Sequence, residues 1–265
     1  MKIFSCLVVA AMIFGTVLLS CDKKYEKEST YPTTIYCLSE KSLLQKRNDF
    51  SKKNPHIKTT LDDFGFCALI GESPIDDYSS GGLTEEEGIA AIRAFVARNL
   101  EYTGISNPNN LQIKRITGNE IGNLKAFCWN FMIERQTIND IEVFHTEILF
   151  CIKNRILTLC HGKHFSDVYV PEKFNVDIEN AKSQLLGKEI FHGSRQGTYS
   201  AGFVTTEHLQ QCTTKLIIVP IGADEKTELH VVWQIDLGTP LEVIFEIDVM
   251  TGEIIRKMSK ISHLM

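Results

Sequence analysis

The chain has 265 residues, of which 43% are hydrophobic and 23% charged, and its formal net charge is −5. This composition excludes a disordered, collagen-like or coiled-coil protein, and the length is enough for one large domain or two small ones. The mean hydropathy of −0.05 excludes a protein with several membrane spans. No basic excess is available to neutralise phosphates, so the composition disfavours nucleic acid as a partner.

The first 20 residues have the pattern of an export signal. A positive start at Lys2 precedes an apolar run over residues 4–19, which is too short to span a bilayer as a helix. The sequence Leu-Leu-Ser-Cys that ends at Cys21 resembles the lipobox of bacterial lipoproteins, in which residues 1–20 would be removed and the Cys lipidated. The resemblance implies attachment to the bacterial cell envelope, at the outer membrane. The alternative is an ordinary secretory signal in which Cys21 has no role.

The segment after the signal is polar. Residues 21–60 are rich in Lys, Glu, Ser, Thr and Asn. Such a composition predicts a flexible tether that lifts a folded domain off the membrane.

Six of the eight cysteines remain once the signal is removed and Cys21 is lipidated. Export places them in a compartment that permits disulfides. No C-x-x-C or C-x-x-H spacing occurs, so a zinc ribbon or a thioredoxin-type site has no support, and six cysteines allow many pairings. The six are Cys37, Cys67, Cys128, Cys151, Cys160 and Cys212.

A helix followed by strands is predicted twice along the chain. In the first copy, Thr84 and Glu87 form a capping-box pattern at the helix start, and Gly104 lies beyond its end. Apolar residues follow the cap at helical spacing, namely Ile89, Ile92, Phe95, Val96 and Leu100.

A β-hairpin is predicted after this helix, from strands over 125–136 and 141–152. The Asn-Asp pair at 139–140 tolerates the positive φ of a two-residue turn. This turn places Trp129 opposite Phe150 on an apolar face, whereas a slip by one residue would scatter that face.

The same register predicts a disulfide on the other face of the hairpin. It places Cys128 opposite Cys151, where Cβ atoms of paired strands come close enough for a bridge after small adjustments. Two free thiols are the alternative. Cys160 lies on a further strand predicted over 156–165, and we expect it to be buried as a small hydrophobic side chain.

The second copy begins with a helix capped by Asp177 and ended by Gly187. Strands with alternating apolar residues follow, and Gly252 turns the chain into a last strand. These strands are predicted over 216–220, 229–237 and 241–249. Helices on one face of antiparallel strands make an α+β fold, here of two helix-plus-antiparallel-sheet units.

Several segments resemble known families. The segments that resemble the fungalysin/thermolysin propeptide are LTEEE at 83–87 and TINDIEVF at 137–144, and those that resemble a PepSY-type module are VVWQI at 231–235 and DVMTGE at 248–253. The resemblance implies a propeptide-like domain over 61–172 and a PepSY-like domain over 173–265, each with a cystatin-like or PepSY-like fold.

In that family the propeptide assists the folding of an attached zinc peptidase and inhibits it until it is removed. The peptidase carries an H-E-x-x-H motif, which this chain does not contain. We therefore expect a stand-alone, non-enzymatic module without a cofactor, which binds a secreted peptidase or another exported protein as an inhibitor or folding helper. The alternative is a surface module that binds peptides, glycans or envelope components.

The outer face of the predicted hairpin offers one set of candidate metal ligands. The register places Glu134 opposite His145, and pairing with the next strand places Glu147 opposite His161. Two imidazoles and two carboxylates can hold zinc, so a metal-dependent hydrolase is a third hypothesis. Lys163, expected opposite His145, disfavours a cation, and the alternative is a solvated face of opposite charges.

Overall fold

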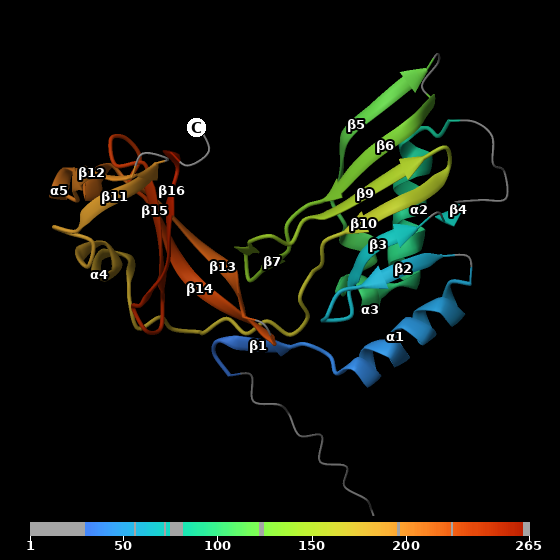
Figure 1. Ribbon diagram of the computed structural model, residues 1–265, viewed down its shortest axis with the longest axis horizontal. Coiled ribbons are helices and arrows are strands. Elements are labelled where there is room, and N and C mark those ends of the chain that lie inside the picture. Colours follow the sequence, from blue (N-terminus) through green and yellow to red (C-terminus); the bar gives the residue numbers. More distant parts are fainter. Residues whose placement is uncertain are drawn as a thin grey trace, which may run out of the picture.

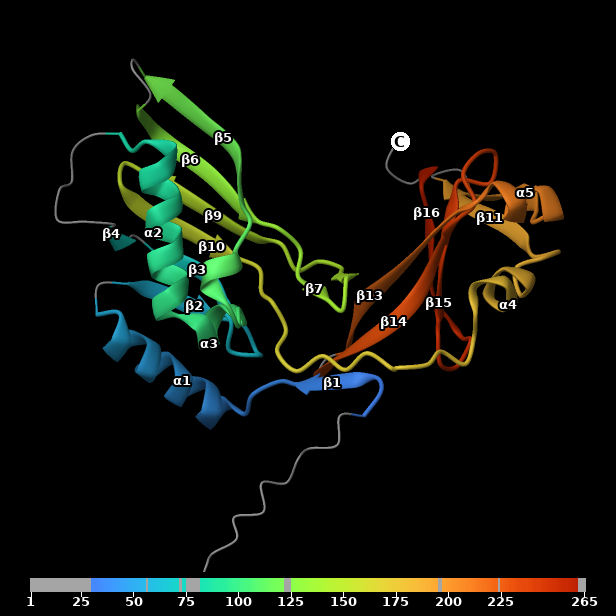
Figure 2. The same cartoon turned by 180° about the vertical axis from the view of Figure 1, so that it is seen from behind.

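The computed structural model describes residues 30–55, 57–71, 73–74, 82–121, 125–194, 197–223 and 225–261. The predicted signal peptide over 1–20 and the predicted lipidation site, Cys21, lie outside these ranges. The described chain forms two lobes, each built on a largely antiparallel sheet with helices packed against it (Figures 1 and 2). The predicted α+β class is therefore confirmed.

The first lobe contains a five-stranded sheet in the order β4-β10-β9-β6-β5. Helices and a separate two-stranded sheet share one hydrophobic core with it. The strands of the larger sheet are β4 (Ser73–Pro74), β5 (Ile113–Ile121), β6 (Lys125–Ile133), β9 (Ile148–Lys153) and β10 (Ile156–His161). The other elements are α1 (Glu40–Lys53), β2 (Lys58–Leu61), β3 (Cys67–Gly71), α2 (Glu85–Arg98), α3 (Leu100–Thr103) and the 3-10 turn η1 (Pro108–Asn110).

Helix α2 begins as its sequence predicts, but it ends at Arg98, and Gly104 ends the short helix α3 that follows. The Thr84 hydroxyl accepts a hydrogen bond from the Glu87 amide at 3.2 Å, and the Glu87 carboxylate accepts one from the Thr84 amide at 2.8 Å. Ile92 and Val96 on its inner face are fully buried. Gly88 lets the helix approach the sheet closely, because a Cβ there would lie 2.7 Å from the Phe131 ring.

The second lobe is built on a seven-stranded sheet in the order β16-β15-β14-β13-β8-β7, with β1 paired to β14. Two short helices and the β11–β12 hairpin pack on one face of it through a shared core. The sheet strands are β1 (Thr33–Tyr36), β7 (Thr137–Ile138), β8 (Ile141–Val143), β13 (Thr213–Ala223), β14 (Lys226–Asp236), β15 (Val243–Asp248) and β16 (Ile254–Ser259). The covering elements are α4 (Ile178–Ser183), β11 (Glu189–Ser194), β12 (Gly197–Phe203) and α5 (Thr206–Gln211).

The second lobe takes strands from the part of the chain before residue 173, so the predicted boundary between domains 61–172 and 173–265 does not separate the two sheets. The β7–β8 hairpin belongs by sequence to the first domain but pairs with β13 of the second lobe. That pairing is parallel, with Ile217 beside Glu142, whereas the other strand pairs of the described chain are antiparallel. Figure 1 shows this hairpin between the two lobes.

The prediction of a polar tether over 21–60 is wrong for the described part of that segment. Strand β1 pairs with β14, and the next element, α1, packs on the first lobe through Phe50, which is fully buried. Asn54 after α1 donates to the Asn99 amide oxygen at 2.8 Å, and both side chains are buried. The polar composition of this segment did not predict a packed helix, because α1 buries only one large apolar side chain, Phe50, together with the side-chain amide of its C-cap, Asn54.

The predicted hairpin register is right at the turn and wrong beyond it. β7 and β8 pair as a two-residue turn at 139–140 requires. Between β8 and β9, however, a second turn adds two residues, with His145 at φ +59°. Trp129 therefore pairs with Ile152, although the shift by two keeps the same residues on the buried face.

This shift also separates the two cysteines that the predicted register placed opposite each other. Cys128 pairs with Lys153, and Cys151 pairs with Asn130. Burial and a hydrogen bond with the Cys151 thiol raise the pKa of Cys128, so the two thiols are diagonal neighbours. They are not bridged in the structure, and the Cys128–Cys151 disulfide remains a prediction.

Candidate functional site

The structure does not bring the four candidate metal ligands together. Glu134 pairs with Lys114 at 3.4 Å, and Glu147 is hydrogen-bonded to Arg135. The His145 ring packs on Phe144, with ring centres 4.2 Å apart, and His161 Nδ1 lies 3.3 Å from the Ala68 carbonyl. Within the described ranges, no group of three or more His, Cys, Asp or Glu side chains could hold a metal ion.

The physical reason is again the pairing of strands. His161 pairs with Leu149 rather than with Glu147, and the turn after β8 moves His145 off the ladder. Lys163, expected opposite His145, instead binds Asp62 at 2.7 Å. The candidate ligands therefore belong to separate ion pairs and turns.

A pocket of about 290 Å³ lies at the end of the first sheet where β5 begins and β6 ends. Three buried apolar side chains, Ile105, Leu111 and Ile133, form part of its wall. The rest of the lining is mostly polar and comes from the loop after α3, the start of β5, the segment after β6 and one residue after β10. These residues are Gly104, Ser106, Asn107, Gln112, Glu134, Arg135, Gln136, Thr137 and His164.

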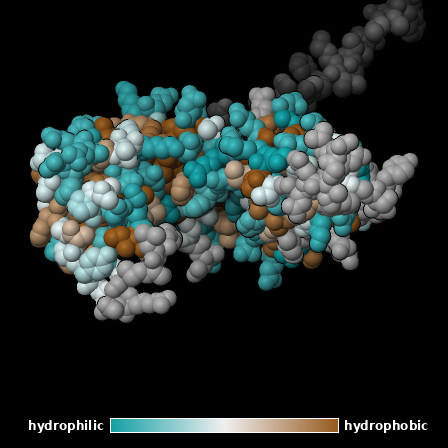
Figure 3. All heavy atoms as spheres, turned by 90° about the horizontal axis from the view of Figure 1, so that it is seen from above, coloured by the Kyte–Doolittle hydropathy of each residue, from teal (hydrophilic) through white to brown (hydrophobic). Residues whose placement is uncertain are grey.

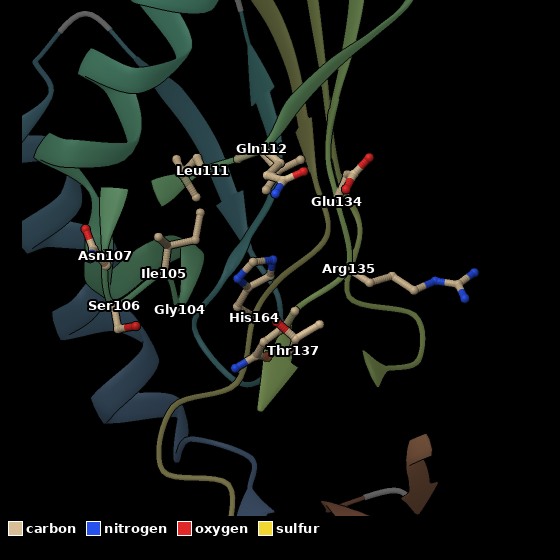
Figure 4. A pocket seen from close by; sticks show the side chains of 12 residues that line it. Gly104, Ile105, Ser106, Asn107, Leu111, Gln112, Glu134, Arg135, Thr137 and His164 are labelled. Carbon is tan, nitrogen blue, oxygen red and sulfur yellow. The ribbon is translucent and has the colours of Figure 1, made fainter. Parts of the chain in front are cut away.

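His164 occupies the centre of the pocket lining, with its ring directed toward Gln112 (Figure 4). Its backbone amide donates to the Thr103 carbonyl at 2.9 Å, a close approach that Gly104 permits. The ring atom Nε2 is buried and has no hydrogen-bond partner in the structure. A buried polar atom without a partner is costly, so it marks the pocket as a place for a hydrogen-bonding ligand group.

The charge state of the pocket follows from this burial. Burial lowers the pKa of His164 below its ordinary value of 6.5, although the carbonyls of Glu134 and Thr146 favour the charged form. The imidazole is therefore neutral at pH 7. Arg135 points away from the other lining residues in Figure 4 and is bound by Glu142 and Glu147. The interior thus suits an uncharged group with a polar tip and an apolar body.

No pattern in the sequence identified His164. The spacing of the chain favoured His145 and His161 instead, because it placed them on a predicted strand face. No periodicity or spacing marks His164, which lies after β10 in the chain that leads to the second lobe. Its environment forms only when Thr103, 61 residues earlier in the chain, and the end of β6 come together around it.

Strand β5, next to the pocket, is the edge strand of its sheet, and among the described residues it pairs with β6 only. Its residues 114–117 are exposed, and Ile116 is 47% exposed at a bulge of the ladder. Figure 3 shows hydrophilic residues interspersed with hydrophobic ones over one face of both lobes, as on an ordinary protein surface. An exposed strand edge with an apolar side chain is a site where an extended peptide can add as a further strand.

Two histidines of the second lobe, His192 and His230, differ from His164 because their ring nitrogens have hydrogen-bond partners within the lobe. His230 Nδ1 lies 2.8 Å from Asp248 Oδ2, and this carboxylate also accepts a hydrogen bond from the Tyr31 hydroxyl at 2.6 Å. His192 lies 2.8 Å from Ser259 Oγ through Nδ1 and 2.8 Å from the Leu241 carbonyl through Nε2. Because His192 is only 1% exposed, this serine–histidine pair fixes the end of β16 rather than meeting a substrate.

The fold and the pocket together define an α+β protein of two sheet-and-helix lobes, in which a pocket around the buried His164 lies beside an edge strand of the described chain. No helix among the described residues is long and apolar enough to cross a membrane. The chain matches no family model and no curated protein.

Among solved structures, the chain is similar to one described as the Bacillus megaterium YpeB C-terminal domain. The two share 11% sequence identity at a TM-score of 0.30, over 84% of this chain and 97% of that one. A likeness at this level assigns neither a family nor a function to the chain.

Proposed function

We propose that the protein is a non-catalytic, lipid-anchored component of the bacterial envelope, with propeptide-like and PepSY-like units. Its function in this proposal is to bind an extended segment of an exported protein, above all a secreted peptidase, and to inhibit it or assist its folding. The lipobox at Cys21 and the propeptide-like segments at 83–87 and 137–144 support it from the sequence.

The proposal rests on one observation: the edge strand β5 begins directly beside the pocket that contains His164. A peptide that pairs with the outer edge of β5 gains main-chain hydrogen bonds, and its side chains supply the specificity. Continued past Ile113, such a peptide reaches Leu111 and Gln112, which line the pocket. One of its uncharged side chains then gives His164 Nε2 the hydrogen-bond partner that the described residues do not provide.

Replacing Ile116 by Glu is expected to weaken this binding at least about tenfold, because it puts a charge where the β5 edge offers an exposed apolar side chain. A tenfold change corresponds to a loss of about 1.4 kcal/mol of binding free energy. The measurement is the inhibition of a secreted zinc peptidase by the mature domain, together with its affinity for that enzyme. Leu44→Glu is the matched control, since Leu44 is 59% exposed on α1, far along the chain from β5. The control variant should inhibit and bind as the wild type does.

Two results would speak against the proposal. If the wild-type domain neither binds secreted peptidases nor changes secreted proteolysis, the inhibitor and helper roles are wrong. If it binds glycans or unrelated peptides on an array with equal strength in both variants, the alternative of a general surface module is supported, and the β5 edge has no part in it.

A further inference from the structure

A buried pair of thiols lies between β3 and β10 in the first lobe. Cys67 is 2% exposed and Cys160 is fully buried, and both belong to the core that α2 covers. β3 lies alongside β10, as Figure 1 shows. The residues that follow the two cysteines are in contact, because His161 Nδ1 lies 3.3 Å from the Ala68 carbonyl oxygen. The two thiols are hydrogen-bonded to each other.

We infer that Cys67 and Cys160 are joined by a disulfide bond in the exported protein. Hydrogen-bonded thiols on neighbouring strands need little side-chain rotation to bring their sulfur atoms to the roughly 2.03–2.05 Å of a disulfide bond. The bond would fix the small β2–β3 sheet to the larger sheet and close a long loop of the chain. The inference rests on the export that the proposed function includes, and it does not depend on the binding of a peptidase.

The oxidation needs a partner, which is the disulfide of a thiol oxidoreductase of the envelope or of glutathione. The thiolate of one cysteine attacks this disulfide, forms a mixed disulfide and releases one thiol of the oxidant. The second cysteine then attacks the mixed disulfide, so that the Cys67–Cys160 bond forms and the second thiol of the oxidant leaves. Two thiols of the chain are oxidised and one external disulfide is reduced to two thiols.

Burial decides when this step takes place. The hydrogen bond with Cys67 and the burial of the thiol raise the pKa of Cys160, which makes its thiolate scarce in the folded protein. The bond must therefore form while β3 is still docking on β10. Once the core has closed, neither an oxidant nor a reductant reaches the two sulfur atoms.

Cys128 and Cys151 provide an internal comparison. They lie on the opposite, partly exposed face of the neighbouring strands β6 and β9, where small thiol reagents have access. Their redox state should follow the buffer in the folded protein, whereas that of Cys67 and Cys160 should not.

The test is to reduce and unfold the full chain and to refold it with oxidised and reduced glutathione. The product is then unfolded without reductant, its thiols are alkylated, and its peptides are analysed by mass spectrometry. We expect Cys67 and Cys160 to escape alkylation and to appear as one cross-linked peptide pair that separates after reduction. In the folded product, this pair should also survive a reductant that opens any Cys128–Cys151 bond.

Two variants complete the experiment. Cys67→Ser should make Cys160 fully alkylatable and lower the midpoint of thermal unfolding. The control is Cys212→Ser, at a half-buried thiol that donates to the Leu209 carbonyl at 3.1 Å. It should change neither the alkylation of Cys160 nor the midpoint of thermal unfolding. Should Cys67→Ser fail to fold, the wild-type peptide analysis decides alone. The inference is overturned if a correctly refolded wild type has both cysteines alkylated, or if either is linked to a different cysteine. Neither result changes the outcome of the peptidase-binding test.

Discussion

Replacing Asp248 by Asn is expected to destabilise the second lobe by about 3 kcal/mol, because it breaks a buried charge pair on one side. The Asp248 side chain is 1% exposed. Its carboxylate accepts hydrogen bonds from the Tyr31 hydroxyl, from His230 and from the backbone amides of Met250 and Thr251. An amide in its place cannot neutralise a protonated His230 and cannot accept at both of its terminal atoms.

The same cluster makes the stability of the second lobe depend on pH. Burial would raise the pKa of Asp248, but the hydrogen bonds from His230, Tyr31 and two backbone amides outweigh it and lower the pKa from 3.8 to about 2. Burial would lower the pKa of His230, but Asp248 and Glu228 raise it above its ordinary value of 6.5. The carboxylate therefore stabilises the fold above pH 3.8 and loses this effect as the pH falls toward 2. The imidazolium stabilises it below pH 6.5 and loses this effect as the pH rises through the raised pKa.

Urea unfolding followed by the fluorescence of Trp233 measures both effects. The chain has two tryptophans, one in each lobe, so a Trp129→Phe background makes Trp233 the reporter of the second lobe. Glu179→Gln is the control, since the Glu179 carboxylate is 79% exposed beside Lys182 and should change stability by less than about 0.5 kcal/mol. A wild-type stability that is flat from pH 4 to pH 8, or an Asp248→Asn variant as stable as the control, would contradict the role of this cluster.

Local signals in the sequence predicted local structure correctly. The caps of Thr84 and Asp177 are formed, and Gly104, Gly187 and Gly252 all have the positive φ that their predicted turns require. These features depend on three or four neighbouring residues, which a sequence window contains in full.

Contacts between distant segments were the ones that the sequence did not predict. The Tyr31 hydroxyl binds the Val231 carbonyl, 200 residues away, and nothing near Tyr31 indicates this partner. The register of the hairpin failed for a related reason. His145 adopts a left-handed conformation that the pattern of alternating side chains does not encode, and this turn exists because β8 leaves the first sheet to pair with β13.

The candidate site also depends on contacts between distant segments, which the sequence did not predict. Spacing alone suggested Glu134, His145, Glu147 and His161 as ligands, yet each has another partner in the fold. The pocket and the unsatisfied Nε2 of His164 arise only when the loop after α3, the end of β6 and the segment after β10 come together. A sequence gives the identity of such a histidine but not its burial.

Gly104→Ala is expected to destabilise the first lobe by about 3 kcal/mol or more and to open the His164 pocket. At φ +71°, a residue with a Cβ is already strained by about 1–2 kcal/mol. The new Cβ would also lie 1.9 Å from the His164 carbonyl oxygen, a clash with backbone that no side-chain rotation relieves. Relief requires moving His164 away from Thr103, whose carbonyl accepts the His164 amide.

Gly187→Ala separates the clash from the backbone strain, because Gly187 has nearly the same φ of +74° and no atom within 4 Å of the Cβ position. Its loss should be only about 1–2 kcal/mol, the cost of the left-handed conformation alone. Urea unfolding in a Trp233→Phe background, with Trp129 as the reporter, measures the Gly104 variant, and Trp233 in the Trp129→Phe background measures the Gly187 variant. An equal loss of unfolding free energy in the two variants would mean that the backbone around His164 moves away from the new Cβ at little cost. In that case the pocket would not hold the histidine in place, and the proposed peptide site would lose its fixed hydrogen-bonding group.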